Sequence, residues 1–315
     1  MEIAMCVAVV SALAMGAVYL IDMAMVGDTY SKPSQAMLIS SVASFLPAPI
    51  LFLLDWNIPP PEAIVVALVG GFVLMLANWL YFIVLFSDEG ECTEIACYEN
   101  SSILVIVLVT ATLSALGYYH ETIFMVQYVG VGLGVIGLLG LALLGVEKIE
   151  RVCFRHRKML IGFMILGAGY ELLVDYALHL ALFSPTIKTP LQAYVSISPF
   201  FWFGLFTGVV AIWPKAERDA LRENWNVIRS KWKWIVAAET CGLVAFGSMV
   251  YSFSVAHVAV VAMIAGSFPI IVFIGGIVLR RSYGFSEEKF PVVDYPAWKT
   301  LAIVLTITGA IIAGS

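Results

Sequence analysis

The chain has 315 residues, of which 61% are hydrophobic and only 12% are charged. Soluble domains carry about 25% charged residues, so this composition excludes an ordinary soluble domain and indicates a multi-pass membrane protein. The formal net charge is −5, and no basic block interleaved with aromatic residues is present, so the sequence gives no sign of a nucleic-acid partner.

Apolar runs of about 20 residues, the length that a spanning helix needs, follow one another along the chain. They are too long and continuous for the strands of a membrane barrel. The first run has no basic start and exceeds a signal-peptide core, so we expect it to remain as a span. Ten spans are predicted, at 3–26, 36–54, 63–86, 101–119, 123–145, 159–183, 190–213, 234–255, 258–280 and 296–314.

The chain divides into two similar halves. A basic linker at 146–158 separates a first half, 1–145, from a second, 159–315. The sequences around four positions match between the halves, and the matched pairs are Gly16 with Gly169, Asp22 with Asp175, Asn78 with Ser248, and Tyr81 with Tyr251. We therefore predict an all-α membrane protein of two inverted five-helix repeats around a central cavity, a plan that many transporters share.

The sixth predicted span carries Glu171, Asp175 and His179 at i, i+4 and i+8, which places them on one stripe of a helix. Ionisable groups within a span are functional-site hypotheses by default. No Lys or Arg is expected inside any span, so a proton or a cationic substrate would neutralise these acids. The alternative for Asp22, Asp175 and His179 is that they lie at the membrane interface and are solvated.

Other polar residues fall within or at the ends of spans. Asn78, Tyr81, Ser248 and Tyr251 either line the cavity or hold helices together through hydrogen bonds. Glu239, at the start of span 8, is either a headgroup-level residue at a helix N-terminus or part of the site.

Proline and glycine residues mark bends and close packing. Pro269 in span 9 and Pro199 in span 7 are expected to kink their helices and to act in gating. Gly130, Gly134 and Gly137 form a small-residue stripe, which favours close helix packing either within the chain or in a homodimer.

The loops carry the information on orientation. All but Lys188 of the 17 Lys and Arg residues fall on one predicted face, which by the positive-inside rule puts both termini outside. Segment 214–233 is basic, with Leu221, Trp225, Ile228 and Trp232 at helical spacing, and is predicted to lie as an amphipathic helix among lipid headgroups; a partner-binding helix is the alternative. Cys92 and Cys97 are either a disulfide or two free thiols.

No hydrolase, zinc or nucleotide-binding motif occurs. The sequence therefore predicts no catalytic residues, no metal site and no cofactor.

Segment 251–281 has a span, a short turn and then Ser267-Phe268-Pro269 opening an apolar run. It resembles spans 8 and 9 of the drug/metabolite transporter superfamily in its ten-span, two-EamA-domain form. Looser similarity lies at 80–82, at 101–121 with Glu121 at its end, and at 127–130. The chain departs from the family in its longer 87–100 loop and in lacking a proline in span 4. It also departs in orientation, because family members commonly keep both termini in the cytoplasm, whereas the charge count puts them outside.

The resemblance implies a permease with a cavity formed mainly by spans 1, 3, 4, 6, 8 and 9. We expect a secondary transporter of a small organic solute in the plasma membrane, coupled to a proton or cation, for example as an antiporter. Glu171 or Asp175 would hold the proton or cation. The alternative is a non-transporting scaffold or sensor that works through segment 214–233.

Overall fold

The computed structural model describes residues 2–26, 28–54, 57–87, 92–116, 125–143, 154–283 and 296–314. Within these ranges the regular structure is helical, apart from one isolated bridge between Val26 and Tyr30. Eight helical segments of the described chain are long and apolar enough to cross a membrane: Ile3–Met25, Pro33–Leu51, Pro61–Leu85, Ile95–Ala115, Lys158–Leu182, Pro190–Ile212, Trp232–Phe253 and Val258–Leu279. Met125–Leu141 and Ala297–Ala313 are shorter apolar helices. The all-α membrane class is confirmed, and each of these segments overlaps a predicted span.

The helices of the first half are α1 (Glu2–Met25), α2 (Pro33–Phe45), α3 (Pro47–Leu54), α4 (Pro61–Leu85), α5 (Cys92–Asn100), α6 (Ser102–Ala115) and α7 (Met125–Leu143). Those of the second half are α8 (Phe154–Leu182), α9 (Pro190–Phe206), the 3-10 helix η2 (Thr207–Ile212), α10 (Lys215–Ser230), α11 (Trp232–Phe253), α12 (Val258–Ala265), α13 (Phe268–Tyr283) and α14 (Pro296–Gly314). Residues 146–153 of the predicted linker lie outside the described residues, as does Glu121.

Several helices begin at a proline, because the first turn of a helix has no partner for its N–H groups and the fixed φ of proline suits that position. Pro33, Pro47, Pro61, Pro190 and Pro296 are each the first residue of a helix. At α9 the preceding Thr189 caps the helix, since its hydroxyl accepts a hydrogen bond from the backbone N–H of Gln192 at 3.2 Å. Local sequence therefore sets where these helices start.

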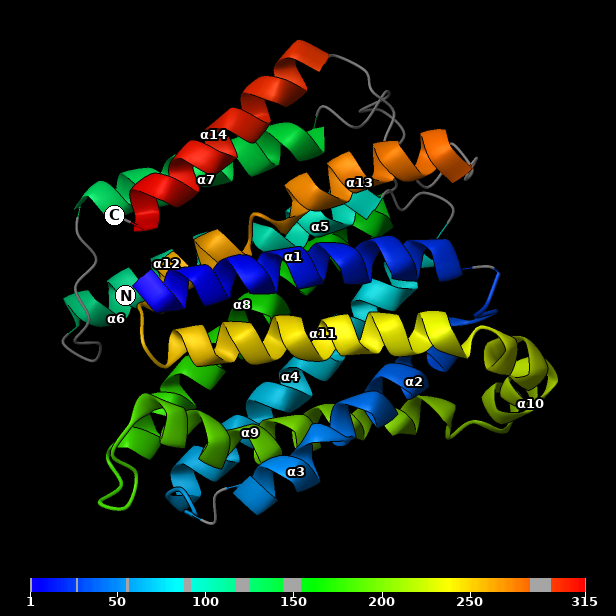
Figure 1. Ribbon diagram of the computed structural model, residues 1–315, viewed down its shortest axis with the longest axis horizontal. Coiled ribbons are helices and arrows are strands. Elements are labelled where there is room, and N and C mark those ends of the chain that lie inside the picture. Colours follow the sequence, from blue (N-terminus) through cyan, green and yellow to red (C-terminus); the bar gives the residue numbers. More distant parts are fainter. Residues whose placement is uncertain are drawn as a thin grey trace.

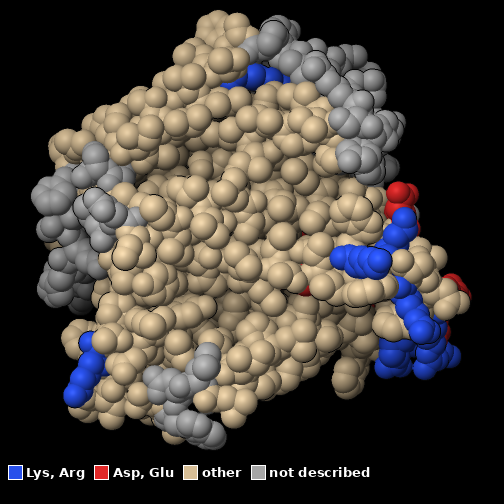
Figure 2. All heavy atoms as spheres, viewed as in Figure 1, with Lys and Arg blue, Asp and Glu red and all other residues tan. Residues whose placement is uncertain are grey.

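The helices run broadly along one direction and pack in pairs (Figure 1). The closest pairings are α1 with α11, α4 with α8, and α7 with α14, and α4 also packs along α9. In the order of the spans, the first helix of each half therefore packs on the third helix of the other half. The face seen in Figure 2 is almost free of charged atoms except at one end and at a few edges, as a lipid-facing surface requires.

The predicted glycine stripe is used within the chain. A Cβ on Gly130 would lie 2.3 Å from the backbone nitrogen of Ala313, and one on Gly137 would lie 2.6 Å from the carbonyl oxygen of Ala302. On the facing helix, a Cβ on Gly309 would lie 2.3 Å from the nitrogen of Gly134. The stripe thus allows backbone contact between α7 and α14, and this face is not free to form a homodimer.

Within the described residues, three spans are each divided into two α-helices: the second span at Leu46, between α2 and α3, and two others whose interruptions meet. The fourth span breaks at Ser101, between α5 and α6, and the ninth breaks at Gly266 and Ser267, between α12 and α13. A Cβ on Gly266 would lie 2.1 Å from Oδ1 of Asn100, so the glycine leaves room for the Asn100 side chain at the second break. Broken helices of this kind are found where a membrane protein lines an internal site.

One expectation was wrong. Lys299 is only 2% exposed, in α14, and its ammonium group lies 5.3 Å from the centre of the Phe273 ring. The expectation that no Lys or Arg is buried in a span therefore fails at this position. An aromatic face can hold a desolvated cation, which accounts for the tolerance of this lysine.

Candidate functional site

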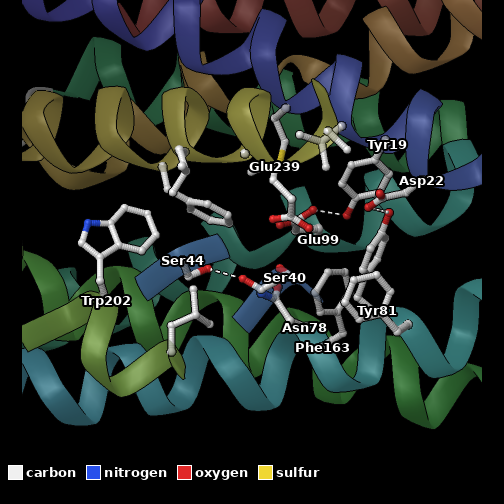
Figure 3. Close-up of a pocket in the computed structure, with 18 residues that line it drawn as sticks. Tyr19, Asp22, Ser40, Ser44, Asn78, Tyr81, Glu99, Phe163, Trp202 and Glu239 are labelled. Atoms are coloured by element: carbon white, nitrogen blue, oxygen red, sulfur yellow. Dashed lines mark hydrogen bonds between the residues drawn. The ribbon is translucent and has the colours of Figure 1, made fainter. Parts of the chain in front are cut away.

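A cavity lies between α1, α2, α4, α5, α8, α9 and α11 (Figure 3). Its polar lining consists of Tyr19, Asp22, Ser40, Ser44, Asn78, Tyr81, Glu99 and Glu239. Phe82, Phe163, Trp202 and Phe246 add aromatic walls. The three carboxylates come from three helices, α1, α5 and α11, so the fold rather than a local motif brings them together.

Tyrosine hydroxyls contact two of these acids. The Tyr81 hydroxyl donates to Oδ2 of Asp22 at 3.1 Å, and the Tyr19 hydroxyl donates to Oε2 of Glu99. The two tyrosine rings pack together with their centres 5.0 Å apart. Through this pair of packed rings, Tyr81 holds Asp22 and Tyr19 holds Glu99 (Figure 3).

The third acid, Glu239, reaches the same cavity from α11, and Ser40 of α2 lies within hydrogen-bond reach of it. In Figure 3 the Glu239 and Glu99 side chains point toward the same space. Of the two sequence interpretations of Glu239, the structure favours membership of the site.

None of the described residues that line this cavity is Lys, Arg or His. Among these described residues the ionisable groups are carboxyls and tyrosine hydroxyls, and aromatic rings surround them. Burying carboxylates without a cation is unfavourable, so such groups take up protons or bind a cation. Carboxylates beside aromatic faces are the groups that recognise an organic cation.

The segment after α1 lies near this site. Tyr30 is 4% exposed there. Burial raises the pKa of the Tyr30 phenol well above its ordinary value, and the negative charges of Asp22 and Glu239 add to the shift. Tyr30 therefore lies close enough to these two acids for their charges to act on it.

A second, smaller pocket adjoins the cavity at the two helix breaks. It is lined by Glu99, Asn100, Tyr170, Glu171 and Gly266, among others. Glu171 and Asn100 are each 7% exposed, and neither Oε2 of Glu171 nor Nδ2 of Asn100 has a hydrogen-bond partner in the described part of the chain. Glu99 lines both pockets, so it connects the Asp22 cavity to Glu171.

The three residues of the stripe predicted on α8, Glu171, Asp175 and His179, do not share one site. Asp175 is buried, at 1% exposed, and lines neither of these pockets. Its backbone carbonyl lies 2.9 Å from Nδ1 of His179, and one carboxylate oxygen lies 3.7 Å from the same nitrogen. Glu171 is therefore the member of the stripe that faces a pocket, whereas Asp175 pairs with His179.

Two predicted cavity residues of the second half, Tyr251 and Ser248, do not line either pocket. The Tyr251 ring packs edge-on against Tyr194 at 6.2 Å. Ser248 offers its carbonyl oxygen to the Ser252 hydroxyl at 2.9 Å. The structure thus brings Asn78, Tyr81 and Asp22 together, but it does not place Ser248 and Tyr251 with them.

The two prolines have different positions. Pro199 stands inside α9 and is buried. Pro269 is the second residue of α13, just after the interruption at Gly266 and Ser267. The ninth span is therefore broken near the predicted place, but Pro269 occupies the first turn of the helix that follows.

Sequence reasoning missed Glu99, because it assigned residues 87–100 to a loop. The structure continues the helical span back to Ile95. The apolar triplet Ile95-Ala96-Cys97, now fully buried, was the signal that this segment enters the membrane. The Cys92 side chain lies outside the described residues.

Comparison with known proteins gives the fold alone. No family model matches the chain, and no curated protein matches it. A solved crystal structure, described only as that of a protein, matches with a TM-score of 0.65 at 14% sequence identity, over 99% of this chain and 96% of its own. The chain therefore has the architecture of a solved protein over nearly its whole length.

Proposed function

We propose that the protein is a secondary transporter that moves a small organic solute bearing an amine or other cationic group. The observation that carries the proposal is the cavity around Asp22, Glu99 and Glu239. It lies among membrane-spanning helices, its ionisable groups are acids and tyrosines, and its walls are aromatic. Small-molecule sites commonly have this make-up, with mainly apolar walls and a few convergent polar groups.

The arrangement of the helices supports alternating access. The pairing of α1 with α11 is matched by that of α8 with α4, and α7 pairs with α14. These are the contacts expected of two five-helix repeats related by a two-fold axis, as in the drug/metabolite transporters that the sequence resembles. Rocking of one repeat against the other would expose the cavity to one side of the membrane at a time.

Glu171 is proposed as the proton or cation site. Its buried Oε2 atom has no hydrogen-bond partner among the described residues, so a proton or small cation would relieve the cost of its burial. Because Glu99 lines both pockets, a change of charge at Glu171 can influence the substrate cavity.

The test is uptake into proteoliposomes driven by an imposed proton gradient, with cationic dyes and amines as probes. Glu99→Gln and Glu171→Gln are expected to abolish gradient-driven uptake while leaving the protein folded by size-exclusion chromatography. Glu62→Gln, at an exposed position in the first turn of α4, is the matched control and should transport normally. Unchanged transport by Glu99→Gln and Glu171→Gln would refute the proposal.

The alternative is a non-transporting scaffold or sensor that works through segment 214–233, and the lack of a solvent-connected central cavity would favour it. The pocket around Asp22, Glu99 and Glu239 supports transport instead.

A further inference from the structure

Six of the described cations gather at one end of the molecule. Lys215, Arg218, Arg222, Arg229, Lys231 and Lys233 lie on α10 or at the start of α11, and all are exposed. Figure 2 shows this group as the main blue area, over the end of the bundle where Figure 1 places α10. We call these six residues the basic surface.

Exposed tryptophans surround the basic surface. Trp213 is 77% exposed, Trp225 48%, Trp232 56% and Trp234 58%. Trp232 and Trp234 open α11, which is itself a membrane-length helix. Tryptophan is enriched at the level of the headgroups, so these residues put α10 at the membrane surface rather than in free solution.

Fixed contacts join α10 to the protein. Glu217 accepts from Lys32 Nζ at 3.1 Å and from the Ser34 hydroxyl at 2.5 Å. Asn224 donates to the carbonyl of Thr29 at 2.8 Å and to Oε1 of Gln35 at 2.8 Å. We call these contacts the α10 latch.

The latch holds the segment that joins α1 to α2. Residues 29–35 include Tyr30, which is buried and lies close enough to Asp22 and Glu239 for their charges to act on it. Gln35 is 0% exposed and also donates to the carbonyl of Ala220 at 3.2 Å. A displacement of α10 would therefore be passed to residues 29–35 through hydrogen bonds with defined partners.

From this arrangement we propose that the basic surface binds anionic phospholipid headgroups and that the α10 latch passes the effect of this binding to segment 28–35, which joins α1 to α2 and includes the first turn of α2. Charge complementarity favours the anionic headgroup, because the six exposed cations outnumber the three acids of α10, Glu217, Asp219 and Glu223, of which Asp219 lies 3.9 Å from Arg222. Each basic residue near an anionic membrane adds to the attraction. The proposal does not depend on what the cavity carries, and its test measures no transport.

The first experiment titrates phosphatidylglycerol or phosphatidylcholine into the detergent-purified full chain and follows the thermal midpoint. Phosphatidylglycerol is expected to raise the midpoint, and phosphatidylcholine at equal concentration is not. Lys215→Gln/Arg218→Gln/Arg229→Gln should raise the half-saturating phosphatidylglycerol concentration roughly 10- to 100-fold. Lys188→Gln, an exposed lysine outside the basic surface, is the control and should change nothing.

The second experiment measures hydrogen exchange at residues 28–35 in phosphatidylcholine nanodiscs with or without phosphatidylglycerol. Phosphatidylglycerol should slow this exchange in the wild type. The Glu217→Gln variant weakens the latch but keeps the basic surface. Phosphatidylglycerol should therefore bind this variant with an unchanged half-saturating concentration, but it should no longer slow the exchange at residues 28–35.

Equal stabilisation by the two lipids would overturn the binding proposal, as would a triple variant that keeps the wild-type titration. Slowed exchange in Glu217→Gln equal to that of the wild type would overturn the role of the latch.

Discussion

Asp22 and Asp175 stand at matching places in the two halves but have different surroundings. Asp22 accepts a hydrogen bond from Tyr81 and lines the main cavity. Asp175 is more deeply buried and lies beside His179 on its own helix. The acid that matches Asp22 by sequence therefore does not line the main cavity.

The cause of this difference lies in the neighbouring helices. α1 meets α5, whose Glu99 accepts from Tyr19, and α4, whose Tyr81 reaches Asp22. The tyrosine that matches Tyr81 by sequence, Tyr251, packs against Tyr194 instead. The result is a cavity built mainly from first-half acids together with Glu239.

The largest expected effect tests this comparison directly. Asp22→Asn should abolish substrate uptake, whereas Asp175→Asn should reduce uptake by less than about tenfold, because Asp175 does not line the cavity. Uptake of a cationic probe into proteoliposomes measures both variants side by side. Equal losses in the two variants would mean that the two halves contribute equally to the site.

Tyr81→Phe sharpens the same comparison. It removes the donor to Asp22, and a hydrogen bond to a charged group contributes about 1.5–3 kcal/mol. We expect a roughly 10- to 150-fold loss of substrate affinity. Tyr251→Phe is the matched variant in the other half and should bind substrate as the wild type does, so an equal loss there would count against the first-half site.

The contact between the halves gives a test of stability. Gly309→Ala places a Cβ 2.3 Å from the nitrogen of Gly134, so it should destabilise the protein by about 1–3 kcal/mol. Gly132→Ala is the control, because no atom lies within 4 Å of its Cβ position. Thermal unfolding in one detergent compares the two, and a Gly309→Ala midpoint equal to that of Gly132→Ala would contradict the α7–α14 packing.

The smallest expected effect is a pH dependence of the α10 latch, through Glu217. The Ser34 hydroxyl and the Lys32 ammonium lower the pKa of Glu217 below its ordinary value of 4.5. A carboxyl with a lowered folded-state pKa stabilises the protein fully above the unfolded pKa, and this contribution is lost as the pH falls through the folded one. The latch should therefore loosen below about pH 4.5, seen as faster exchange at residues 28–35. Glu217→Gln should lack this pH step, and a step that persists there would assign it to another group.

The sequence predicted the helical membrane class because spanning length and apolar content are local properties. It also predicted Asp22, Asn78 and Tyr81 as cavity residues, and these three do line the cavity. Glu99 was missed because an acidic stretch precedes it and hides the start of its helix. Tyr251 was included because sequence matching between the halves cannot reveal which helix a side chain faces.

The central claim is that the Asp22, Glu99 and Glu239 cavity recognises a cationic solute. Ligand-dependent thermal stabilisation across a panel of amines, cationic drugs, amino acids, sugars and nucleotides tests it most directly, since a ligand that binds the folded state raises the midpoint. The account predicts that cationic members stabilise the wild type and that Glu99→Gln loses this stabilisation. Stabilisation by anionic nucleotides instead, or an unchanged response in Glu99→Gln, would contradict it.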